Sequence, residues 1–199
     1  VMQLTYHIEK ANLHYLYSFS ELNPNLPSIK AIHEKYGQFG SYETKKIILL
    51  VRDPRDALVS RYHQHKHEYS SYQDINDFIL NSSELSSYIK DYNLWWHNSN
   101  ELADLLVVRY EDMKANTQYE LTKVLDFLKI EAEPETIADA VEYASFKNMR
   151  SIEAKGSSEV RAGVLRTSAI QDGVITDQNS LKVRKGKVGG YREELSSEV

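Results

Sequence analysis

The sequence predicts an α/β fold in which a parallel sheet is flanked by helices. Two apolar runs, Lys46–Arg52 and Leu105–Arg109, are continuous rather than alternating, which is typical of strands buried on both faces of a parallel sheet. A helical pattern follows each run, and this alternation of strand and helix indicates parallel βαβ units. The chain has 199 residues, and we expect it to form a single domain.

The other elements follow from spacing and capping residues. Residues 3–19 have weak helical spacing, and residues 28–32 form a short candidate strand. Asp53 is a good N-cap for a helix that begins at Pro54 and continues to about His67, with Asp56 near the positive end of its dipole. Further helices are expected over 73–80, 83–97 and 135–144. Between the last two, a turn at Glu111–Asn116 is expected to lead into a helix that carries Leu128.

Residues 151–183 differ from the rest of the chain. They are rich in Ser, Gly, Thr and Asp and have no sustained periodicity. A loop of this length is usually functional or disordered, so we expect a mobile loop over 151–183.

The two ends predict a chain that is truncated on both sides. Val1 precedes Met2 and does not resemble a natural translation start. The last residues, 195–199, resemble a helix N-cap with an acidic first turn, but no helix follows.

Composition excludes several functional classes. The chain is 41% hydrophobic and 27% charged, unlike a disordered chain or a collagen-like repeat. Its net charge of −5 lacks the basic excess of a general nucleic-acid binder, so no nucleic-acid partner is expected. The absence of cysteine excludes thiol catalysis and fits a reducing compartment, and we expect a cytoplasmic location. No apolar run reaches the roughly 18 residues of a membrane-spanning helix.

The junction between the first predicted strand and its helix is a candidate anion site. Arg52 leaves the carboxyl end of the strand, where open α/β sheets place their ligands. Its planar guanidinium suits phosphate, and Ser60, two turns into the helix, can add a neutral donor. The alternative interpretation is a helix cap beside a surface Arg–Asp pair.

The segment Arg184–Gly190 combines three cations with three glycines. Glycine permits the positive φ and the close approach that a phosphate-binding nest requires. A flexible basic turn in solvent is the alternative. No Gly-x-x-x-x-Gly-Lys-Ser/Thr loop occurs in the chain, which disfavours a nucleoside-triphosphate kinase.

Three further sets of residues have weaker chemical interpretations. His63 and His67 share one helix face, but no third ligand is evident and we expect no metal. His33, at the end of a candidate strand, is either a general base or a polar loop residue. Glu111 and Asp112 are either paired acid/base carboxylates or a turn that caps the following helix. A hydrolase triad has no Gly-x-Ser-x-Gly elbow here.

Four segments, in order along the chain, resemble the sulfotransferase family that uses 3′-phosphoadenosine 5′-phosphosulfate (PAPS). Residues 48–60 resemble the 3′-phosphate-binding strand and helix, with Arg52 and Ser60 at the two binding positions. Residues 108–114 resemble the Tyr-Glu-Asp segment, in which Tyr110 approaches the nucleotide.

The other two segments lie in the last third of the chain. Residues 145–149 resemble the segment whose aromatic residue and methionine, Phe146 and Met149 here, pack on adenine. Residues 184–189 resemble the Arg-Lys-Gly-x-x-Gly element that closes on the 3′-phosphate. Its first three positions are Arg184, Lys185 and Gly186.

The resemblance implies a sulfotransferase architecture related to P-loop NTPases. It also implies transfer of a sulfuryl group from PAPS to an acceptor hydroxyl or amine of a small molecule, with adenosine 3′,5′-bisphosphate (PAP) as product and no metal. His33 falls where the family keeps its catalytic histidine. Lys30 lies near the position of a family lysine, at a spacing one residue longer.

One part of the family pattern is absent from the 199 residues. The N-terminal phosphosulfate-binding loop, a strand followed by a Lys-Ser-Gly-Thr-like turn, has no counterpart here. Either this loop precedes Val1 or the chain cannot catalyse transfer. A non-catalytic module that binds PAP or PAPS, or a related nucleotide kinase, therefore stands as the alternative.

Overall fold

The computed structural model of the chain describes residues 36–37, 42, 44–64, 72–102, 104–155, 170–171, 174–175 and 181–197. The chain divides into two compact units. In the described part, the first comprises residues 36–131 with 187–197, and the second comprises residues 132–186. The expectation of a single domain over 1–199 stays a prediction, and each unit is described in turn.

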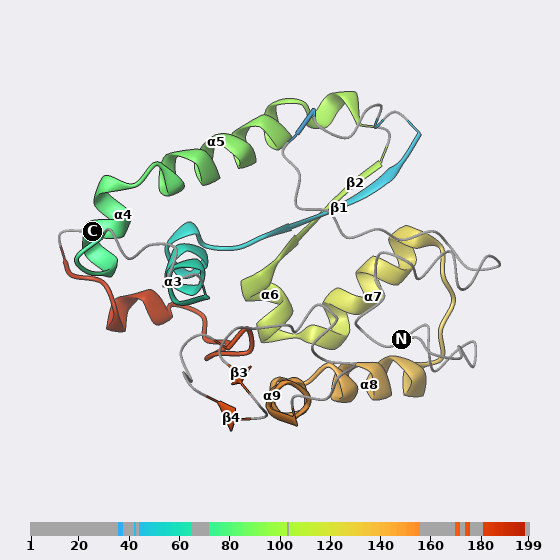
Figure 1. Cartoon of the computed structure of the whole chain (residues 1–199). Helices are drawn as coiled ribbons and strands as arrows, with labels where there is room; N and C mark the ends of the chain where they lie inside the picture. The colour runs from blue at the N-terminus through green and yellow to red at the C-terminus, as the bar shows by residue number, and fades with distance from the viewer. Residues whose placement is uncertain are drawn as a thin grey trace. The chain divides into compact units, whose positions relative to one another are not determined.

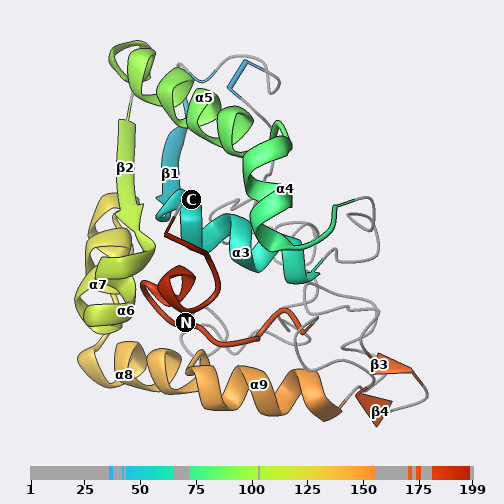
Figure 2. The same cartoon turned by 90° about the vertical axis from the view of Figure 1, so that its left-hand side faces the viewer.

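The first unit is built on two parallel strands, β1 (Lys46–Val51) and β2 (Asp104–Arg109). Lys46 lies opposite Asp104 and Val51 opposite Arg109, so both carboxyl ends reach the same edge. Helix α3 (Pro54–Gln64) follows β1, and α6 (Tyr110–Ala115) follows β2 at this edge (Figure 2).

Four more helical segments complete the path of this unit up to residue 131. They are α4 (Ile75–Asn81), α5 (Glu84–His97), the 3-10 turn η2 (Ser99–Glu101) and α7 (Thr117–Leu128). α5 and α7 lie on opposite sides of the two strands (Figure 1). The strand pair is therefore flanked by helices, as the sequence predicts.

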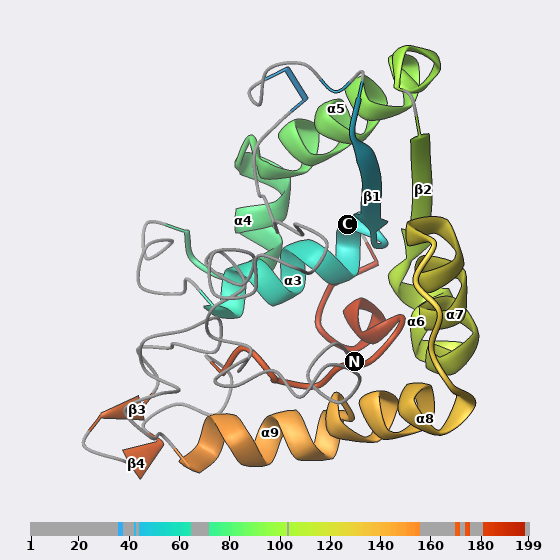
Figure 3. The ribbon, with the colours of Figure 1, turned by 90° about the vertical axis from the view of Figure 1, so that its right-hand side faces the viewer.

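The C-terminal segment returns to the first unit and packs on α3. Its 3-10 turn η4 (Gly190–Glu193) lies beside that helix (Figure 3). The core of the unit joins α3, α4 and this turn, because Tyr191 packs with Leu58, Val59 and Phe78. Burial of these large apolar side chains is the main force that attaches the C-terminal segment to α3.

The second unit contains α8 (Pro134–Tyr143) and α9 (Phe146–Lys155), which lie end to end (Figure 3). A small antiparallel pair, β3 (Ile170–Gln171) and β4 (Val174–Ile175), also belongs to it. Among the described residues of both units, no helix has the length and apolar character needed to cross a bilayer.

Three expectations from the sequence need correction. β1 is not buried on both faces, because Ile48 and Leu50 on one face are exposed, Leu50 by 55%. The expected turn at Glu111–Asn116 is the helix α6. Within the range 151–183, expected to be a loop, residues 151–155 instead continue α9 to Lys155, and the strand pair β3–β4 also lies in that range.

Candidate anion-binding site

A cleft of about 800 Å³ lies at the carboxyl ends of β1 and β2 in the first unit. Its lining also includes residues from the start of α3, from α5 and from the C-terminal segment. The charged lining residues are four arginines and three carboxylates: Arg52, Arg55, Arg109, Arg192, Asp53, Asp56 and Glu111. This position agrees with the general rule that open α/β sheets bind ligands beyond the carboxyl ends of their strands.

Arg52 is fixed through its backbone while its side chain keeps donors available. Its amide donates to the hydroxyl of Tyr92 at 3.0 Å, and this hydroxyl lies 2.7 Å from that of Tyr88. The guanidinium lies over the ring of Tyr110, 4.3 Å from its centroid. Nη2 donates to the carbonyl of Lys187 over a long 3.4 Å, and no described residue accepts from the buried Nε.

A buried guanidinium donor without an acceptor is unusual, because buried polar groups in proteins are almost always paired. A bound anion would accept from Nε. The stacking on Tyr110 holds the guanidinium plane, which favours a planar two-point contact with a phosphate. Burial raises the pKa of the Tyr110 hydroxyl, against the opposing effect of Arg52, so the ring stays neutral at physiological pH.

Asp53 and Arg55 form a self-contained pair at the start of α3. Asp53 Oδ1 accepts from the Arg55 amide at 2.9 Å, which confirms the predicted N-cap. Arg55 Nη2 donates to Asp53 Oδ2 at 2.7 Å, and this hydrogen bond from Arg55 lowers the pKa of the Asp53 carboxyl. Arg55 therefore has its charge neutralised within the cleft.

Glu111 ties the two strand ends together. Its Oε1 accepts from the Asp53 amide at 2.9 Å, which links the start of α6 to the β1–α3 junction. From the sequence, Glu111 is expected to be either an acid/base carboxylate or part of a turn that caps the following helix. The structure favours a structural role, but Glu111 supports the start of α3 and not the helix that follows it.

Asp56 is a site residue whose role the sequence did not reveal. Asp56 is buried, with only 3% of the residue exposed. Its Oδ2 accepts from the Gly189 amide at 2.6 Å, and its Oδ1 accepts from the Tyr191 amide at 2.9 Å. One feature of the sequence could have indicated this role. Asp56 lies three residues before Val59, on the apolar face of α3, and a carboxylate on such a face needs a buried hydrogen-bond partner.

Tyr191 completes the attachment of the C-terminal segment. Its ring contacts two guanidinium groups, with Arg55 4.1 Å and Arg192 4.6 Å from its centroid. Gly189, two residues earlier, has φ +72°, a conformation that favours glycine. The positive φ that the sequence predicts for a glycine of this segment is therefore observed, and the phosphate nest stays a prediction.

In the second unit, α9 holds the backbone of the residues that precede Gly186. Glu153 is completely buried and accepts from the amides of Lys182 at 2.8 Å and Val183 at 2.9 Å. Arg150 donates to the carbonyl of Val183 and, at 3.0 Å, to that of Arg184. Burial lowers the pKa of the Lys182 ammonium, which the nearby Glu153 carboxylate opposes.

Phe146 and Gly186 are in direct contact in the second unit. Gly186 has φ +58°, and a Cβ placed on it would lie 2.6 Å from Cδ2 of the Phe146 ring. The absence of a side chain at Gly186 therefore allows the ring to lie against the backbone. Met149, one turn further along α9, is half-buried.

The predicted site residues thus fall into three groups. Arg52 and Tyr110 meet in the first unit, whereas Ser60 is half-buried on α3 and does not line the cleft. Phe146, Met149, Arg184, Lys185 and Gly186 belong to the second unit. His33 and Lys30 lie outside the described residues.

The histidine pair considered for a metal is not assembled in the described part of the chain. His63 Nε2 lies 2.5 Å from Glu194 Oε2, so this histidine contacts the C-terminal segment. His67 lies outside the described residues. Within the described ranges, no group of three or more His, Cys, Asp or Glu side chains is arranged to hold a metal ion.

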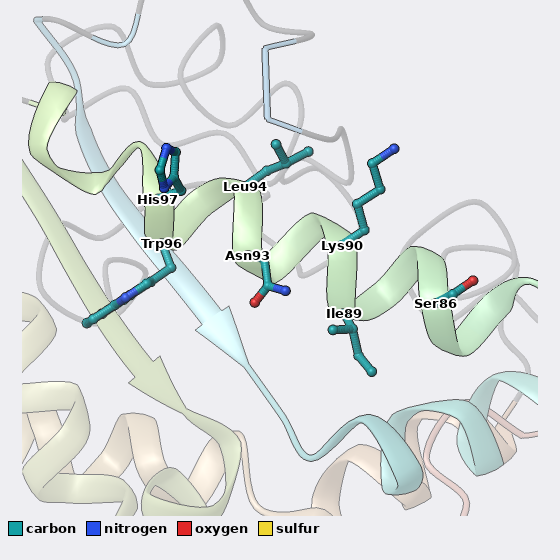
Figure 4. Close-up of a pocket in the computed structure, with 7 residues that line it drawn as sticks. All are labelled: Ser86, Ile89, Lys90, Asn93, Leu94, Trp96 and His97. Carbon is teal, nitrogen blue, oxygen red and sulfur yellow. The ribbon is translucent and has the colours of Figure 1, made fainter.

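A second hollow, of about 720 Å³, lies along α5 and is lined by that helix alone. Lys90 and Leu94 point away from Ile89 and Asn93 (Figure 4). Trp96, 74% exposed, extends from the same helix, while the neighbouring Trp95 is buried. Because the polar side chains of Lys90 and Asn93 point in different directions, the hollow does not form a convergent anion site.

Comparisons with known proteins connect this geometry to a family. A family model described as a sulfotransferase domain matches residues 33–199. Sulfotransferase 2A6 of Rattus norvegicus is 30% identical over 118 residues, which cover 53% of this chain and 39% of the relative. Sulfotransferase 1E1 of Bos taurus is 27% identical over 157 residues, which cover 76% of this chain and 50% of the relative. The chain spans about half the length of the curated relatives it matches.

Solved structures agree at the level of the fold. Mouse sulfotransferase SULT7A1 complexed with PAP matches with a TM-score of 0.55 and 22% identity, over 77% of this chain and 54% of that one. Retinol dehydratase in complex with androsterone and the inactive cofactor PAP matches with a TM-score of 0.54 and 22% identity, over 77% and 43%. The predicted α/β sulfotransferase fold is confirmed. Because the family model covers most of its length, the chain belongs to the sulfotransferase domain family.

Proposed function

We propose that the protein carrying this chain transfers a sulfuryl group from PAPS to a hydroxyl or amine of a small-molecule acceptor. The family membership supports a sulfotransferase. The single observation that carries the proposal is Arg52, whose buried Nε has no acceptor among the described residues, at the carboxyl end of a parallel strand. That donor fits the 3′-phosphate, a group that PAPS carries and ATP lacks.

The proposed nucleotide site takes residues from four segments of the chain. Arg52, Ser60, Arg184 and Lys185 hold the 3′-phosphate by charge-assisted and neutral hydrogen bonds. Gly186 allows close approach of the backbone, as its positive φ and its contact with Phe146 support. The side chains that pack on the nucleoside are Tyr110, Phe146 and Met149.

The chain's own catalytic contribution is proposed to come from His33. Bound PAPS would supply the sulfuryl group and depart as PAP. His33 removes the proton from the attacking acceptor group, a role suited to an imidazole near neutral pH. No metal is part of the proposal.

The class of acceptor and the location are proposed from the named relatives and from the composition. Retinol dehydratase, a fold relative, was solved with androsterone and with retinol, which supports a small-molecule acceptor. A cytoplasmic location rests on the absence of cysteine and on the likeness to cytosolic sulfotransferase 12 of Arabidopsis thaliana, 24% identical over 193 residues. That match covers 92% of this chain and 55% of the relative.

Transfer of radiolabelled sulfate from PAPS to a panel of alcohols, phenols, amines, sugars and lipids tests the function. We expect label in at least one class of acceptor with the full-length protein. His33→Ala should lower turnover by roughly 10²- to 10⁴-fold while keeping PAP affinity. His97→Ala, on the exposed end of α5, is the matched control and should change neither.

The alternative is a non-catalytic module that binds PAP or PAPS. It would bind PAP in a calorimetric titration and transfer no label to any acceptor. Wild-type turnover in His33→Ala would remove this histidine from the mechanism, and absence of PAP binding would contradict both the enzyme and the module.

A further inference from the structure

We infer that Asp56 is a positioning residue that sets the geometry of the Arg52 anion site through the backbone of residues 187–191. The inference rests on the proposed function and adds to it a residue that itself does not contact the nucleotide. Asp56 lies in the first turn of α3, four residues after Arg52, and its carboxylate is buried.

The first step concerns the glycine-rich turn. The sequence suggests that its amides form a nest for phosphate, but the Gly189 and Tyr191 amides donate to Asp56 at 2.6 and 2.9 Å. A Cβ on Gly190 would lie 3.8 Å from Asp56 Oδ1, so the turn wraps around the carboxylate. The nest is therefore occupied by an anion of the protein itself.

The second step links this turn to Arg52. Lys187, two residues before Gly189, places its carbonyl 3.4 Å from Arg52 Nη2. The Tyr110 ring lies against the guanidinium, 4.3 Å from it. Arg52 is thus oriented by the Lys187 carbonyl and the Tyr110 ring, and the position of that carbonyl depends on the turn that Asp56 holds.

The consequence is a guanidinium that is oriented before the ligand arrives. A long, rotatable side chain that is already ordered loses less conformational entropy on binding. Without the Asp56 carboxylate, the turn at residues 187–191 loses two amide acceptors, and Arg52 loses its fixed neighbour. Anion affinity should then fall although every residue that contacts the nucleotide is unchanged.

A double-mutant cycle on PAP affinity tests the inference, with calorimetry on the full-length protein. Asp56→Asn keeps the size of the side chain, but its amide has a single oxygen and cannot replace both carboxylate oxygens as acceptors. We expect this variant to bind PAP roughly tenfold more weakly. Arg52→Ala should bind still more weakly, and Arg52→Ala/Asp56→Asn should match Arg52→Ala alone. Asp56 acts only through Arg52 in this account, so the two effects should not add.

Asp74→Asn is a control for the same change of side-chain charge outside the cleft. Asp74 caps α4 and also accepts two backbone amides, those of Asn76 at 2.8 Å and Asp77 at 2.9 Å, but it does not line the cleft. This variant should bind PAP as wild type does. A purely structural contribution of Asp56 would instead weaken Arg52→Ala further in the double variant.

The outcomes separate this inference from the proposed function. A wild-type protein that does not bind PAP contradicts the proposed function, and the inference falls with it. A wild type that binds, together with equal affinity in Asp56→Asn or additive effects in the cycle, overturns the inference alone. Amide hydrogen exchange in the wild-type protein keeps the inference testable if a variant misfolds. The Gly189 and Tyr191 amides should be protected from exchange without ligand, and unprotected exchange at these amides would overturn the inference as well.

Discussion

In each unit, one carboxylate and one arginine contact the backbone of a segment near the C-terminus. The segment is 181–186 in the second unit and 187–191 in the first, and the two arginines differ in how many of their donors the fold uses. In the second unit, Glu153 accepts two amides and Arg150 donates to two carbonyls of residues 182–184. In the first unit, Asp56 accepts two amides, whereas Arg52 makes one long contact of 3.4 Å and keeps a buried Nε without an acceptor among the described residues.

The difference separates an arginine committed to structure from one available to a ligand. The donors of Arg150 that face residues 183 and 184 are already used within the fold, so replacing it should cost stability. Arg52 gives the fold little through its side chain, so replacing it should cost binding. Buried carboxylates hold the backbone in both units, and the arginines distinguish their roles.

The largest expected effect is that replacing Arg52 weakens PAP binding, whereas replacing Arg150 lowers the melting temperature. Arg52→Ala should weaken PAP binding by roughly 10- to 100-fold, since hydrogen bonds to charged groups contribute about 1.5–3 kcal/mol. Its melting temperature should stay close to that of wild type. Arg150→Ala should show a lower melting temperature, and calorimetry with a thermal melt on each variant provides both readings. Equal effects of the two variants on both quantities would remove the distinction.

The next effect concerns the structural carboxylate. Glu153→Gln should lower the free energy of unfolding by about 1–3 kcal/mol, because one of two buried amides loses its acceptor. In a chain of this length that corresponds to a melting temperature roughly 2–12 °C lower. Glu142→Gln, an exposed position on α8, is the control. A change in Glu153→Gln no larger than in this control would show that the contact contributes little.

The next effect is expected at Gly186, the glycine that ends the segment 181–186. Gly186→Ala should cost about 1–2 kcal/mol for its positive φ, and more because the new Cβ meets the Phe146 ring. Gly37→Ala isolates the first contribution, since Gly37 has φ +86° and no atom within 4 Å of its Cβ position. Urea unfolding of both variants measures the difference, and an equal cost would mean that the ring moves aside freely.

The smallest effect is a pH dependence at the mouth of the cleft. Arg55 lowers the pKa of Asp53 in the folded state, so the pair adds stability above the ordinary aspartate pKa of about 3.9. That stability is lost as pH falls through the lowered folded pKa. Asp53→Asn should be less stable than wild type by about 0.2–1 kcal/mol at pH 7, and the gap should be smaller at pH 3, below the ordinary aspartate pKa. Thermal melts at both pH values test this, and a gap that widens in acid would contradict it.

Much of the first unit could be predicted from local sequence. The apolar run of β1, the Asp53 cap and the Pro54 start fix the β1–α3 junction locally, and they correctly placed Arg52 at a strand end. The exposure of Leu50 could not be predicted, because an apolar run does not reveal which faces are covered.

The two buried carboxylates could not be predicted, because their partners lie far away in the sequence. Asp56 binds the Gly189 amide 133 residues later, and Glu153 binds the Lys182 amide 29 residues later. The start of α9 at Phe146 and its extension past residue 151 were missed for a related reason. That helix is polar on average, and Arg150 and Glu153 contact the backbone of residues 182–184, which lie far along the chain.

The most direct test follows the Nε–H signals of Arg52 and Arg150 by nitrogen-15 NMR during a titration with PAP. Loss of one signal in Arg52→Lys and of another in Arg150→Lys assigns them. The Arg52 signal should shift as PAP binds, because the anion becomes its acceptor, while the Arg150 signal should stay in place. A saturating titration that leaves the Arg52 signal unmoved would contradict the account.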